Sequence, residues 1–336
     1  MGKLSIKDIA KMADVSVAAV SYVINGKEGV GQEQRKKIER IIREHGFTPN
    51  LNSKRLVLSR SFNIHVVIRT EAAPACKEFY FGVVARMTEE IGKYGYSIVP
   101  AYQSDNELDG SVVRALQNKN TDGLVFFQGI SEDVLEKVKK SEVPYSIINP
   151  GFADNSTPCV RIDFEEIAYR ATSYLAECGH RQIGFIGMDR LPVFYTQTRS
   201  GYLRALKENG MEAKEQWIAG GAYDEESARA AASKLFAQEE LPTAVFCAQD
   251  NFAICAMDAA RKRGLKVPDD VSFIAVDDIP VSKYIDPPLT TVPIDQSILA
   301  KCALEMMFAQ LAGEKVRNVT VPIEAIVERQ SVKKYG

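Results

Sequence analysis

The 336-residue sequence predicts an α/β protein, in which a small all-α head precedes a two-lobed body with two parallel sheets. Two observations predict this fold class. The first 48 residues read as short amphipathic helices, whereas from residue 61 onward short continuous apolar runs alternate with helical segments. Continuous apolar strands separated by helices are typical of parallel sheets that are covered on both faces. A body of about 280 residues is long for one such sheet, which favours two lobes.

The first helix of the head is predicted to begin after Ser5, a favourable N-cap residue. Asp8 stands three residues later, so the two side chains are expected to form a capping box. The apolar residues on the core-facing side of this helix are Ile6, Ile9, Ala10 and Ala13. Asp14 follows, and because Asp tolerates the left-handed conformation better than most residues, a tight turn is predicted there.

Two further helices complete the predicted head. Ser16 is expected to cap a second helix that runs to about Asn25, and a third is predicted from about Gln32 to His45, with Gly46 as its C-terminal cap. The residues expected to face the core are Val20, Val23, Ile24, Ile38, Ile41 and Ile42. Two short helices joined by a tight turn indicate a helix-turn-helix unit.

In such a unit, the N-terminal residues of the second helix meet base edges in the major groove of DNA. These residues are Val17, Ala18, Ser21 and Tyr22, of which Val17 and Ala18 suit packing on thymine methyl groups. A small helical bundle without a DNA role is the alternative that the pattern leaves open. Charge favours DNA binding, because residues 1–60 hold 12 basic and 6 acidic residues, whereas the whole chain has a net charge of −2.

Short motifs follow one another along the head and continue into the body. Those of the head are Ile6–Ala10, Val15-Ser16, Val20-Ser21, Val23, Asn25 and Gly46–Asn50. Those of the body are Cys178–Ile186, Gly201-Tyr202, Ala205-Leu206, Pro242–Phe246, Asp250, Ala253, Val267–Val271, Ala275–Asp278, Pro288–Val292 and Glu328–Ser331. In this order the motifs resemble the lactose-repressor (LacI/GalR) family of bacterial transcription factors over nearly the whole chain. The resemblance implies a ligand-responsive regulator that binds DNA.

The resemblance also implies a hinge helix after the head. In that family the hinge folds on operator DNA and inserts a leucine into the minor groove, and by position this leucine is Leu56. An apolar wedge partly unstacks a base step and bends the duplex. The full set of residues implied to bind DNA is Ser5, Ser16, Val17, Ala18, Ser21, Tyr22, Asn25, Asn50, Ser53, Lys54 and Leu56.

Several positions of the head depart from the family pattern. Tyr22 replaces the usual Arg, Ala19 the usual Thr and Gly31 the usual Ser, while Ser53-Lys54 replaces an Ala-Arg pair. An Arg at position 22 would be able to make a bidentate contact with guanine, which Tyr cannot make. The preferred DNA half-site is therefore expected to differ from those of relatives.

Seven apolar runs of the body are predicted to form strands: Ile64–Ile68, Tyr96–Val99, Gly123–Phe127, Tyr145–Ile148, Ile183–Ile186, Ala244–Cys247 and Val271–Val276. The resemblance implies a periplasmic-binding-protein-like body, in which the chain crosses between lobes three times, here near residues 160, 291 and 320. The implied domains are a head over 1–48, a hinge over 49–60 and a body over 61–336. Within the body, the N-lobe is expected over about 61–159 and 292–319, and the C-lobe over about 160–291 and 320–336.

A ligand of such a body is expected in the cleft between the lobes, at the carboxyl ends of the strands. The positions implied to bind it are Arg69, Phe79, Asn149, Thr198, Arg199, Tyr223, Gln249, Asp277 and Gln296. Asp277 is implied to accept hydrogen bonds from ligand hydroxyls, which suits a diol because a carboxylate offers about four lone-pair sites. Arg69 and Arg199 together would favour an anionic ligand, although ordinary surface positions explain both equally well. The expected effector is a small polar metabolite, with a sugar or a sugar phosphate as the favoured class.

Other kinds of site have little support. The six cysteines form no C-x-x-C motif and the three histidines are scattered, so neither a metal nor a cofactor is expected. No signal peptide and no apolar run of about 18 residues is seen, which predicts a cytoplasmic protein with reduced cysteines. No nucleophile or acid–base pair stands out, so an enzyme is not expected. A solute-binding module and a sugar-active enzyme remain the alternatives.

The predicted function is transcriptional repression by a homodimer. Two heads related by a twofold axis match a palindromic operator, which favours an even number of subunits. The sequence has no heptad segment after the Glu328–Ser331 motif, so a dimer is expected rather than a tetramer.

Overall fold

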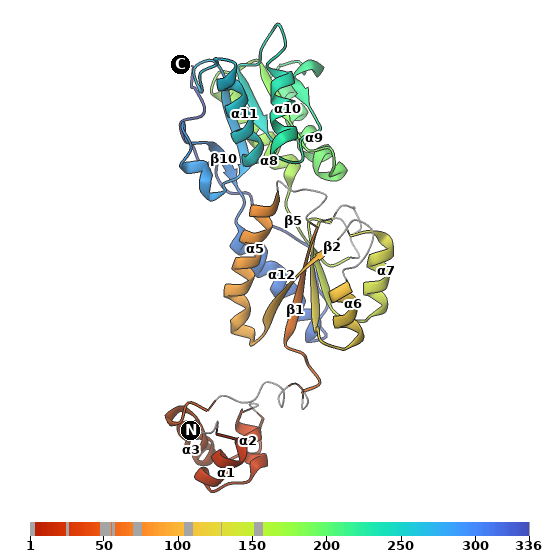
Figure 1. The fold of residues 1–336 in the computed structure, drawn as a ribbon, viewed down its shortest axis with the longest axis vertical. Helices are drawn as coiled ribbons and strands as arrows, with labels where there is room; N and C mark the ends of the chain where they lie inside the picture. Colours follow the sequence, from red (N-terminus) through yellow and green to blue (C-terminus); the bar gives the residue numbers. More distant parts are fainter. Residues whose placement is uncertain are drawn as a thin grey trace. The chain divides into compact units, whose positions relative to one another are not determined.

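The computed structural model describes residues 4–24, 27–47, 55, 58–69, 76–103, 110–128, 130–150 and 157–335. The chain divides into two compact units, Met1–Ser61 and Phe62–Gly336 (Figure 1). Within the described ranges, no helix has both the length and the apolar character needed to cross a membrane.

The first unit is the helical head. It contains α1 (Ile6–Ala13), α2 (Val17–Ile24) and α3 (Gln32–Glu44). Its buried core consists of Ile9, Ala10, Ala13, Val20, Val23, Ile38 and Ile41, against which Ile6, Val15, Ile24, Val30, Ile42 and Phe47 pack partly buried. Every residue predicted to face the core belongs to this set, which confirms the three-helix prediction.

Side-chain caps define where the first two helices begin. The backbone N–H of Asp8 donates to Ser5 Oγ at 3.4 Å and that of Ser5 donates to Asp8 Oδ2 at 2.8 Å, so the predicted capping box is confirmed. These hydrogen bonds from Ser5 hold the pKa of Asp8 below its ordinary value. Asp14 has φ 55°, which confirms the left-handed turn. Ser16 Oγ then accepts from the backbone N–H of Ala19 at 3.1 Å.

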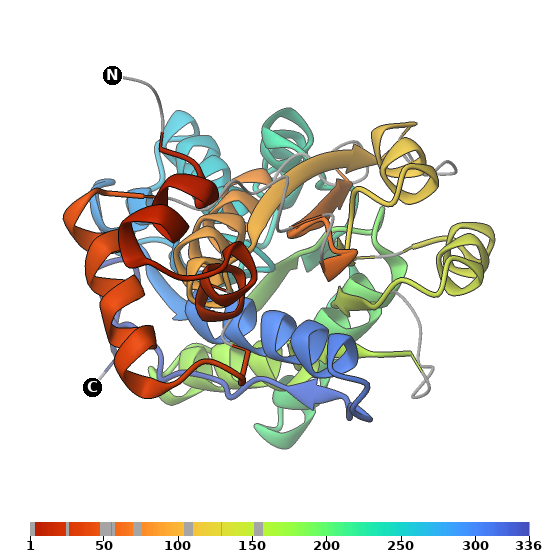
Figure 2. The same cartoon turned by 90° about the horizontal axis from the view of Figure 1, so that it is seen from below.

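The second unit begins with a six-stranded sheet in the order β11-β5-β4-β3-β1-β2. Its strands, all paired in parallel, are β1 (Asn63–Arg69), β2 (Ser97–Gln103), β3 (Gly123–Phe127), β4 (Tyr145–Ile148), β5 (Cys159–Arg161) and β11 (Val319–Thr320). Helices α6 (Gly110–Gln117) and α7 (Glu132–Lys140) cover one face. Helices α5 (Lys77–Ile91) and α12 (Gln296–Leu311) pack together on the other (Figures 1 and 2). We call this layered part the N-lobe.

The C-lobe contains a five-stranded sheet in the order β10-β9-β8-β6-β7. Its strands, again all parallel, are β6 (Ile183–Ile186), β7 (Ile218–Ala219), β8 (Ala244–Cys247), β9 (Ser272–Asp277) and β10 (Thr290–Pro293). Helices α8 (Phe164–Glu177) and α9 (Pro192–Glu208) pack against each other, as do α10 (Glu225–Leu235) and α11 (Asp250–Lys262). The sheet therefore lies between two helical pairs.

All seven predicted apolar runs form strands, and the predicted fold class is confirmed. The four strands that were not predicted are β5, β7, β10 and β11. Two of them, β7 and β11, are only two residues long and are not fully buried, so they carry no continuous apolar run. All six cysteines are free, and five of them are buried.

The chain passes between the two sheets from β5 to α8, from β10 to α12 and again after β11. These passages are hydrogen-bonded to one another. The backbone N–H of Val321 donates to the carbonyl of Arg161 at 2.9 Å. Thr291 and Val327 form an antiparallel bridge, with N–H···O distances of 3.2 and 2.9 Å. The backbone between the lobes is thus a set of paired segments rather than independent linkers.

Gly201 fixes α9 closely against α8. A Cβ at this position would meet the carbonyl oxygen of Glu165 and would lie 2.8 Å from the backbone nitrogen of Tyr169. Because α8 starts directly after the first passage between the sheets, this contact also positions the beginning of the C-lobe.

Candidate DNA interface and effector site

Helix α2 has one buried face and one exposed face. Val20 and Val23 lie in the core of the head. The exposed residues are Ser16, Val17, Ala18 and Tyr22, with Ser21 partly buried beside them. Val17 is 42% exposed and Tyr22 43%, so two large apolar side chains remain open to water. The predicted base-reading residues therefore lie on one accessible face, and their contact with DNA stays a prediction.

The loop after α2 packs against Tyr22. Gly29 has φ 113°, and a Cβ there would lie 3.3 Å from Cδ2 of the Tyr22 ring. The backbone N–H of Lys27 donates to the carbonyl of Tyr22 at 2.8 Å, and Arg35 donates to the carbonyl of Lys27 at 2.6 Å. The loop therefore restricts the position of a predicted reading residue, a feature that the sequence did not reveal.

Ser5 serves the head itself. Its hydroxyl donates to Asp8 Oδ2 at 2.7 Å, so the side chain is engaged in capping α1 although it is exposed. The other residues predicted to bind DNA lie outside the described residues: Asn25, Asn50, Ser53, Lys54 and Leu56. Most of the predicted hinge, over 49–60, falls there as well.

The two lobes contact each other where α5 and α11 begin. Cys76 directly precedes α5, and its Sγ accepts a hydrogen bond from Gln249 Nε2 at 2.9 Å. Glu78 Oε2 accepts from Asn251 Nδ2 at 3.1 Å. We call these four residues the lobe junction. Helix α11 directly follows β8, so the junction lies at the carboxyl end of that strand, which is where a ligand was predicted.

Gln249 brings an unused polar atom to the lobe junction. Its side chain is 5% exposed, and Oε1 has no hydrogen-bond partner within the described part of the chain. Burial raises the pKa of the Cys76 thiol to about 12, so this partner of Gln249 stays neutral. A buried carbonyl oxygen that accepts no hydrogen bond destabilises the folded protein, so this atom is suited to accept a hydrogen bond from a ligand. Cys76 was not predicted, because an isolated cysteine before a helix gives no sequence signal.

Asp277 lies beside this pair. It ends β9 with φ 115°, a strained conformation for a non-glycine residue, and it interacts electrostatically with Cys76 of the other lobe. Burial raises the pKa of Asp277 well above its ordinary value, and the nearby charge of Asp250 raises it further. The structure thus brings together Asp277 and Gln249, two of the predicted effector residues.

Two other predicted effector residues are occupied by their own lobes. Asn149 directly follows β4, and its Oδ1 accepts from the backbone N–H of Ile162 at 2.8 Å, which holds the start of the first passage between the sheets. Thr198 is buried, and its hydroxyl donates to the carbonyl of Phe194 at 2.9 Å within α9. Their hydrogen bonds therefore explain both residues without a ligand.

The two predicted cationic positions are not brought together by any described contact. Arg199 pairs with Glu215 at 3.1 Å, and both side chains are solvent-accessible. Arg69 ends β1, and its side chain lies outside the described part of the chain. The observed ion pair favours a surface role for Arg199 over capture of an anion.

Phe79 and Gln296 pack inside the N-lobe. Phe79 is 6% exposed and meets Tyr80 edge-on, with ring centroids 6.0 Å apart. The carboxamide of Gln296 fills the space above Gly82, where a Cβ would overlap it. Both side chains support α5 and therefore the Cys76 end of the lobe junction.

Tyr223 has a cationic neighbour that sequence reasoning missed. The guanidinium carbon of Arg190 lies 3.3 Å from the centroid of the Tyr223 ring, a cation–π arrangement. Arg190 belongs to the loop after β6, so it stands at the carboxyl end of that strand. One face of the ring predicted to stack on a sugar is thus covered by Arg190.

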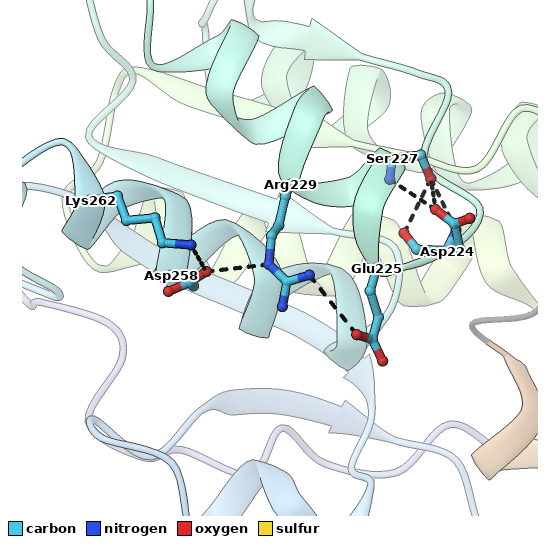
Figure 3. Close-up of polar contacts among 6 residues, drawn as sticks. All are labelled: Asp224, Glu225, Ser227, Arg229, Asp258 and Lys262. Atoms are coloured by element: carbon cyan, nitrogen blue, oxygen red, sulfur yellow. Dashed lines mark hydrogen bonds and ion pairs between the residues drawn. The ribbon is translucent and has the colours of Figure 1, made fainter.

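A polar network holds the segment that carries Tyr223 (Figure 3). Asp224 caps α10 through Ser227, whose Oγ also accepts from the backbone N–H of Tyr223 at 3.0 Å. Arg229 on α10 contacts Asp258 on α11 at 3.2 Å. The network is completed by ion pairs of Arg229 with Glu225 and of Lys262 with Asp258. Figure 3 shows how the contact between Arg229 and Asp258 joins the two helices, and the backbone of Tyr223 is linked to this network through Ser227.

Comparison with known proteins gives matches at both ends of the chain. The family model "Bacterial regulatory proteins, lacI family" matches residues 5–50, and "Periplasmic binding protein-like domain" matches residues 172–332. Catabolite control protein A of Priestia megaterium is 31% identical over 335 residues, covering 98% of this chain and 99% of the relative. The HTH-type transcriptional repressor PurR of Mannheimia succiniciproducens is 30% identical, covering 99% of each chain.

Solved structures share the fold over nearly the full length. The transcriptional regulator CelR in complex with cellobiose has a TM-score of 0.72 and 26% identity, covering 98% of this chain and 99% of its own. The Lac repressor dimer bound to operator and the anti-inducer ONPF has a TM-score of 0.79 and 23% identity, covering 99% and 100%.

Proposed function

Because the chain belongs to the lacI family of bacterial regulatory proteins, we propose that it is a ligand-responsive repressor that binds a palindromic operator as a homodimer. The observation that carries the proposal is the accessible face of α2, on a head with 12 basic and 6 acidic residues over positions 1–60. A twofold arrangement of two heads matches two half-sites, and a solved fold relative is a dimer on its operator.

The domain limits that we propose follow from this function. The head spans 1–48, the hinge 49–60 with Leu56 as the minor-groove wedge, and the body 61–336. The N-lobe takes about 61–159 and 292–319, and the C-lobe about 160–291 and 320–336. The strand order of the two sheets and the three hydrogen-bonded passages between them support this division.

Regulation is proposed to act through the relative position of the lobes. An effector bound next to Gln249 and Asp277 would add contacts at the lobe junction and favour one lobe arrangement. In a dimer, a change of this kind alters the spacing of the two hinges and hence the free energy of folding them on DNA.

The proposed effector is a small polar metabolite, of which a neutral sugar is the favoured class. Gln249 Oε1, which has no hydrogen-bond partner among the described residues, suits a hydroxyl donor, and the relative CelR was solved with cellobiose. A sugar phosphate is the weaker candidate, because Arg199 is paired with Glu215. We further propose that the protein acts in the cytoplasm. It binds its effector without converting it chemically. Incubation of the protein with sugars and sugar phosphates tests this, since product formation would refute it.

The deciding experiment is the selection of genomic fragments by the full-length protein, with and without a pool of metabolites. A palindromic consensus whose enrichment changes with the pool is the expected result. Random fragments, or enrichment that ignores every metabolite, would contradict the proposal. A two-lobe solute-binding module is the alternative, and it would bind a metabolite while enriching no DNA sequence.

Two binding measurements sharpen the DNA part. Affinity for the selected operator should fall about a thousandfold between roughly 50 and 200 mM salt, because basic residues displace counterions from phosphates. Leu56→Ala should weaken operator binding far more than binding to random duplex, since the wedge acts only on a bent, specific site. Equal losses on both duplexes would remove the wedge role.

A further inference from the structure

Helix α2 offers DNA a reading face that carries no charge. Its sequence, Val17–Ile24, contains neither an acidic nor a basic residue, and its exposed side chains are Val17, Ala18 and Tyr22. Such a face cannot make the bidentate contacts of arginine with guanine, whereas apolar side chains suit the methyl group of thymine. The choice of sequence then depends on how accurately the largest of these side chains, Tyr22, is held.

Gly29 supports the ring of Tyr22 from the loop after α2. Its φ is 113°, a backbone conformation that favours glycine. A Cβ at this position would lie 3.3 Å from Cδ2 and 3.4 Å from Cε2 of the Tyr22 ring, which is close enough to displace the ring. The absence of a side chain at position 29 therefore lets the backbone lie directly against one side of the ring.

The loop that carries Gly29 is fixed on both sides of it. The backbone N–H of Lys27 donates to the carbonyl of Tyr22 at 2.8 Å. The guanidinium of Arg35, on α3, donates to the carbonyl of Lys27 at 2.6 Å. On the other side of Gly29, Val30 packs partly buried against the core of the head. Gly29 thus lies between two anchored residues, and the support it gives to the ring is part of the folded head.

Support of this kind matters more for an exposed tyrosine than for a residue that binds through charge. Tyr22 is 43% exposed, and its ring loses rotational freedom when it is fixed against a base. A ring that is already held in the free protein loses less, so the difference in free energy between a matching and a mismatching base pair is better preserved.

We propose that Gly29 and Arg35 are positioning residues for DNA specificity, because the loop they shape holds the Tyr22 ring for packing on a thymine methyl group. Neither residue has to touch a base. Loss of a phosphate contact weakens binding to all sequences about equally, whereas a change at a base-reading side chain relaxes the preference at one base pair. The inference rests on the proposed DNA binding and adds which residues outside the reading face set its specificity.

Selection from a pool of randomised duplexes by the full-length protein and its variants tests this role. Tyr22→Ala identifies the base pair that Tyr22 reads, as the position whose preference collapses, and an A·T pair is expected there. The unchanged protein should prefer that pair roughly tenfold over the alternatives, and Gly29→Ala and Arg35→Ala should each reduce this preference about threefold or more. Preferences at the other base pairs should remain. A G·C pair at this position would overturn the thymine contact.

Two further comparisons separate positioning from a general effect on the head. In a Tyr22→Ala background, neither Gly29→Ala nor Arg35→Ala should relax any base pair further, because the ring through which they act is missing. Gly46→Ala is the matched control, since Gly46 also has a positive φ, of 57°, but a Cβ there meets nothing within 4 Å. It should leave every base preference unchanged.

The proposal is overturned if Gly29→Ala and Arg35→Ala keep the full preference, or if their losses persist in the Tyr22→Ala background. Should Gly29→Ala not fold, as judged by denaturation, Arg35→Ala decides, since it removes one hydrogen bond from the loop and leaves Gly29 in place. Tyr22→Phe, at an exposed position, keeps the ring and should keep the preference, and its loss would also count against ring packing. If the unchanged protein enriches no sequence at all, the proposed function fails, whereas a palindrome that the loop variants do not alter refutes this inference alone.

Discussion

The accessible face of α2 and the lobe junction are both candidate binding surfaces, but they are built in different ways. On α2, the side chains of Val17, Ala18 and Tyr22 project from a single eight-residue helix. At the junction, Gln249 and Cys76 come from opposite lobes and are 173 positions apart in the chain. The first surface needs only local structure and a small core, whereas the second exists only while two sheets hold their positions.

This difference has an energetic consequence. A change in the head should remain within the head, because its core is closed by three helices. A substitution in the body should alter the geometry of the effector site even from a distant position, because the contacts that place the site join segments far apart in the sequence. The predictions below test this contrast in order of decreasing expected effect.

The largest effect is expected for Ile38→Ala. Ile38 is fully buried in the core of the head, and its truncation should lower the free energy of unfolding of that unit by about 2–5 kcal/mol. DNA binding should be lost while the unfolding transition of the body stays in place, as followed by denaturation and operator titration. Gln34→Ala, at an exposed and uncharged position of the same helix, is the control and should change neither. A shift of both transitions together would show that the head is not independent.

The same contrast explains how much the sequence revealed. The three helices, the capping box of Ser5 and Asp8 and the exposed side of α2 follow from spacing within about 45 residues, and the structure agrees with them. The C-cap of α3 is His45, one residue before the predicted Gly46. The long strands were predictable too, because each is one continuous apolar run. The short strands β7 and β11 were not, since two residues held by neighbouring strands carry no pattern of their own.

The effector positions show where sequence reasoning ends. Asn149 and Thr198 stay predictions as effector residues, but the sequence did not reveal that their side chains are bonded to the backbone of Ile162 and Phe194. Arg190 was overlooked, because its relation to Tyr223 arises only when β6 and the start of α10 meet. The partner of Thr198 lies one helical turn away, whereas the contacts of Asn149 with Ile162 and of Arg190 with Tyr223 depend on tertiary packing, which single-sequence patterns do not encode.

The next effect concerns the body and is expected from Gly201→Ala. Within a helix, alanine stabilises the folded state by about 1 kcal/mol relative to glycine, but at this position its Cβ would collide with the backbone of α8. The clash should outweigh that gain and destabilise the C-lobe by about 1–3 kcal/mol. Chemical denaturation measures the loss, and hydrogen exchange around Ile162 should rise because α8 starts there. Gly92→Ala, which meets nothing within 4 Å, should be neutral or slightly stabilising. Equal behaviour of the two variants would contradict the close-packing argument.

Ser5→Ala should have a smaller effect, confined to the head. Loss of the capping box should cost about 1 kcal/mol, seen as a lower unfolding midpoint of the head alone. The folded pKa of Asp8 is lowered by its bonds to Ser5, so this stabilisation is present above the unfolded pKa of about 3.9. It is lost as the pH falls through the folded value. The difference between the variant and the unchanged protein should therefore shrink in acid, and a difference independent of pH would argue against the Ser5–Asp8 coupling.

The smallest effect on stability, but the one most specific to the lobe junction, is expected from Asn251→Ala. The bond from Asn251 to Glu78 is exposed, so its removal should change the free energy of unfolding by only about 0.5 kcal/mol. Acting between lobes, the same energy should still shift the ratio of closed to open arrangements roughly twofold, which small-angle scattering and cross-lobe distance measurements detect. Asn209→Ala removes a similar bond, from Asn209 to the carbonyl of Ala205 within the C-lobe, and should leave the lobe distance unchanged. If both variants moved the lobes equally, the contact between Asn251 and Glu78 would have no special part in setting the arrangement of the lobes. The contrast with the self-contained head would then rest on the buried pair Cys76–Gln249 alone.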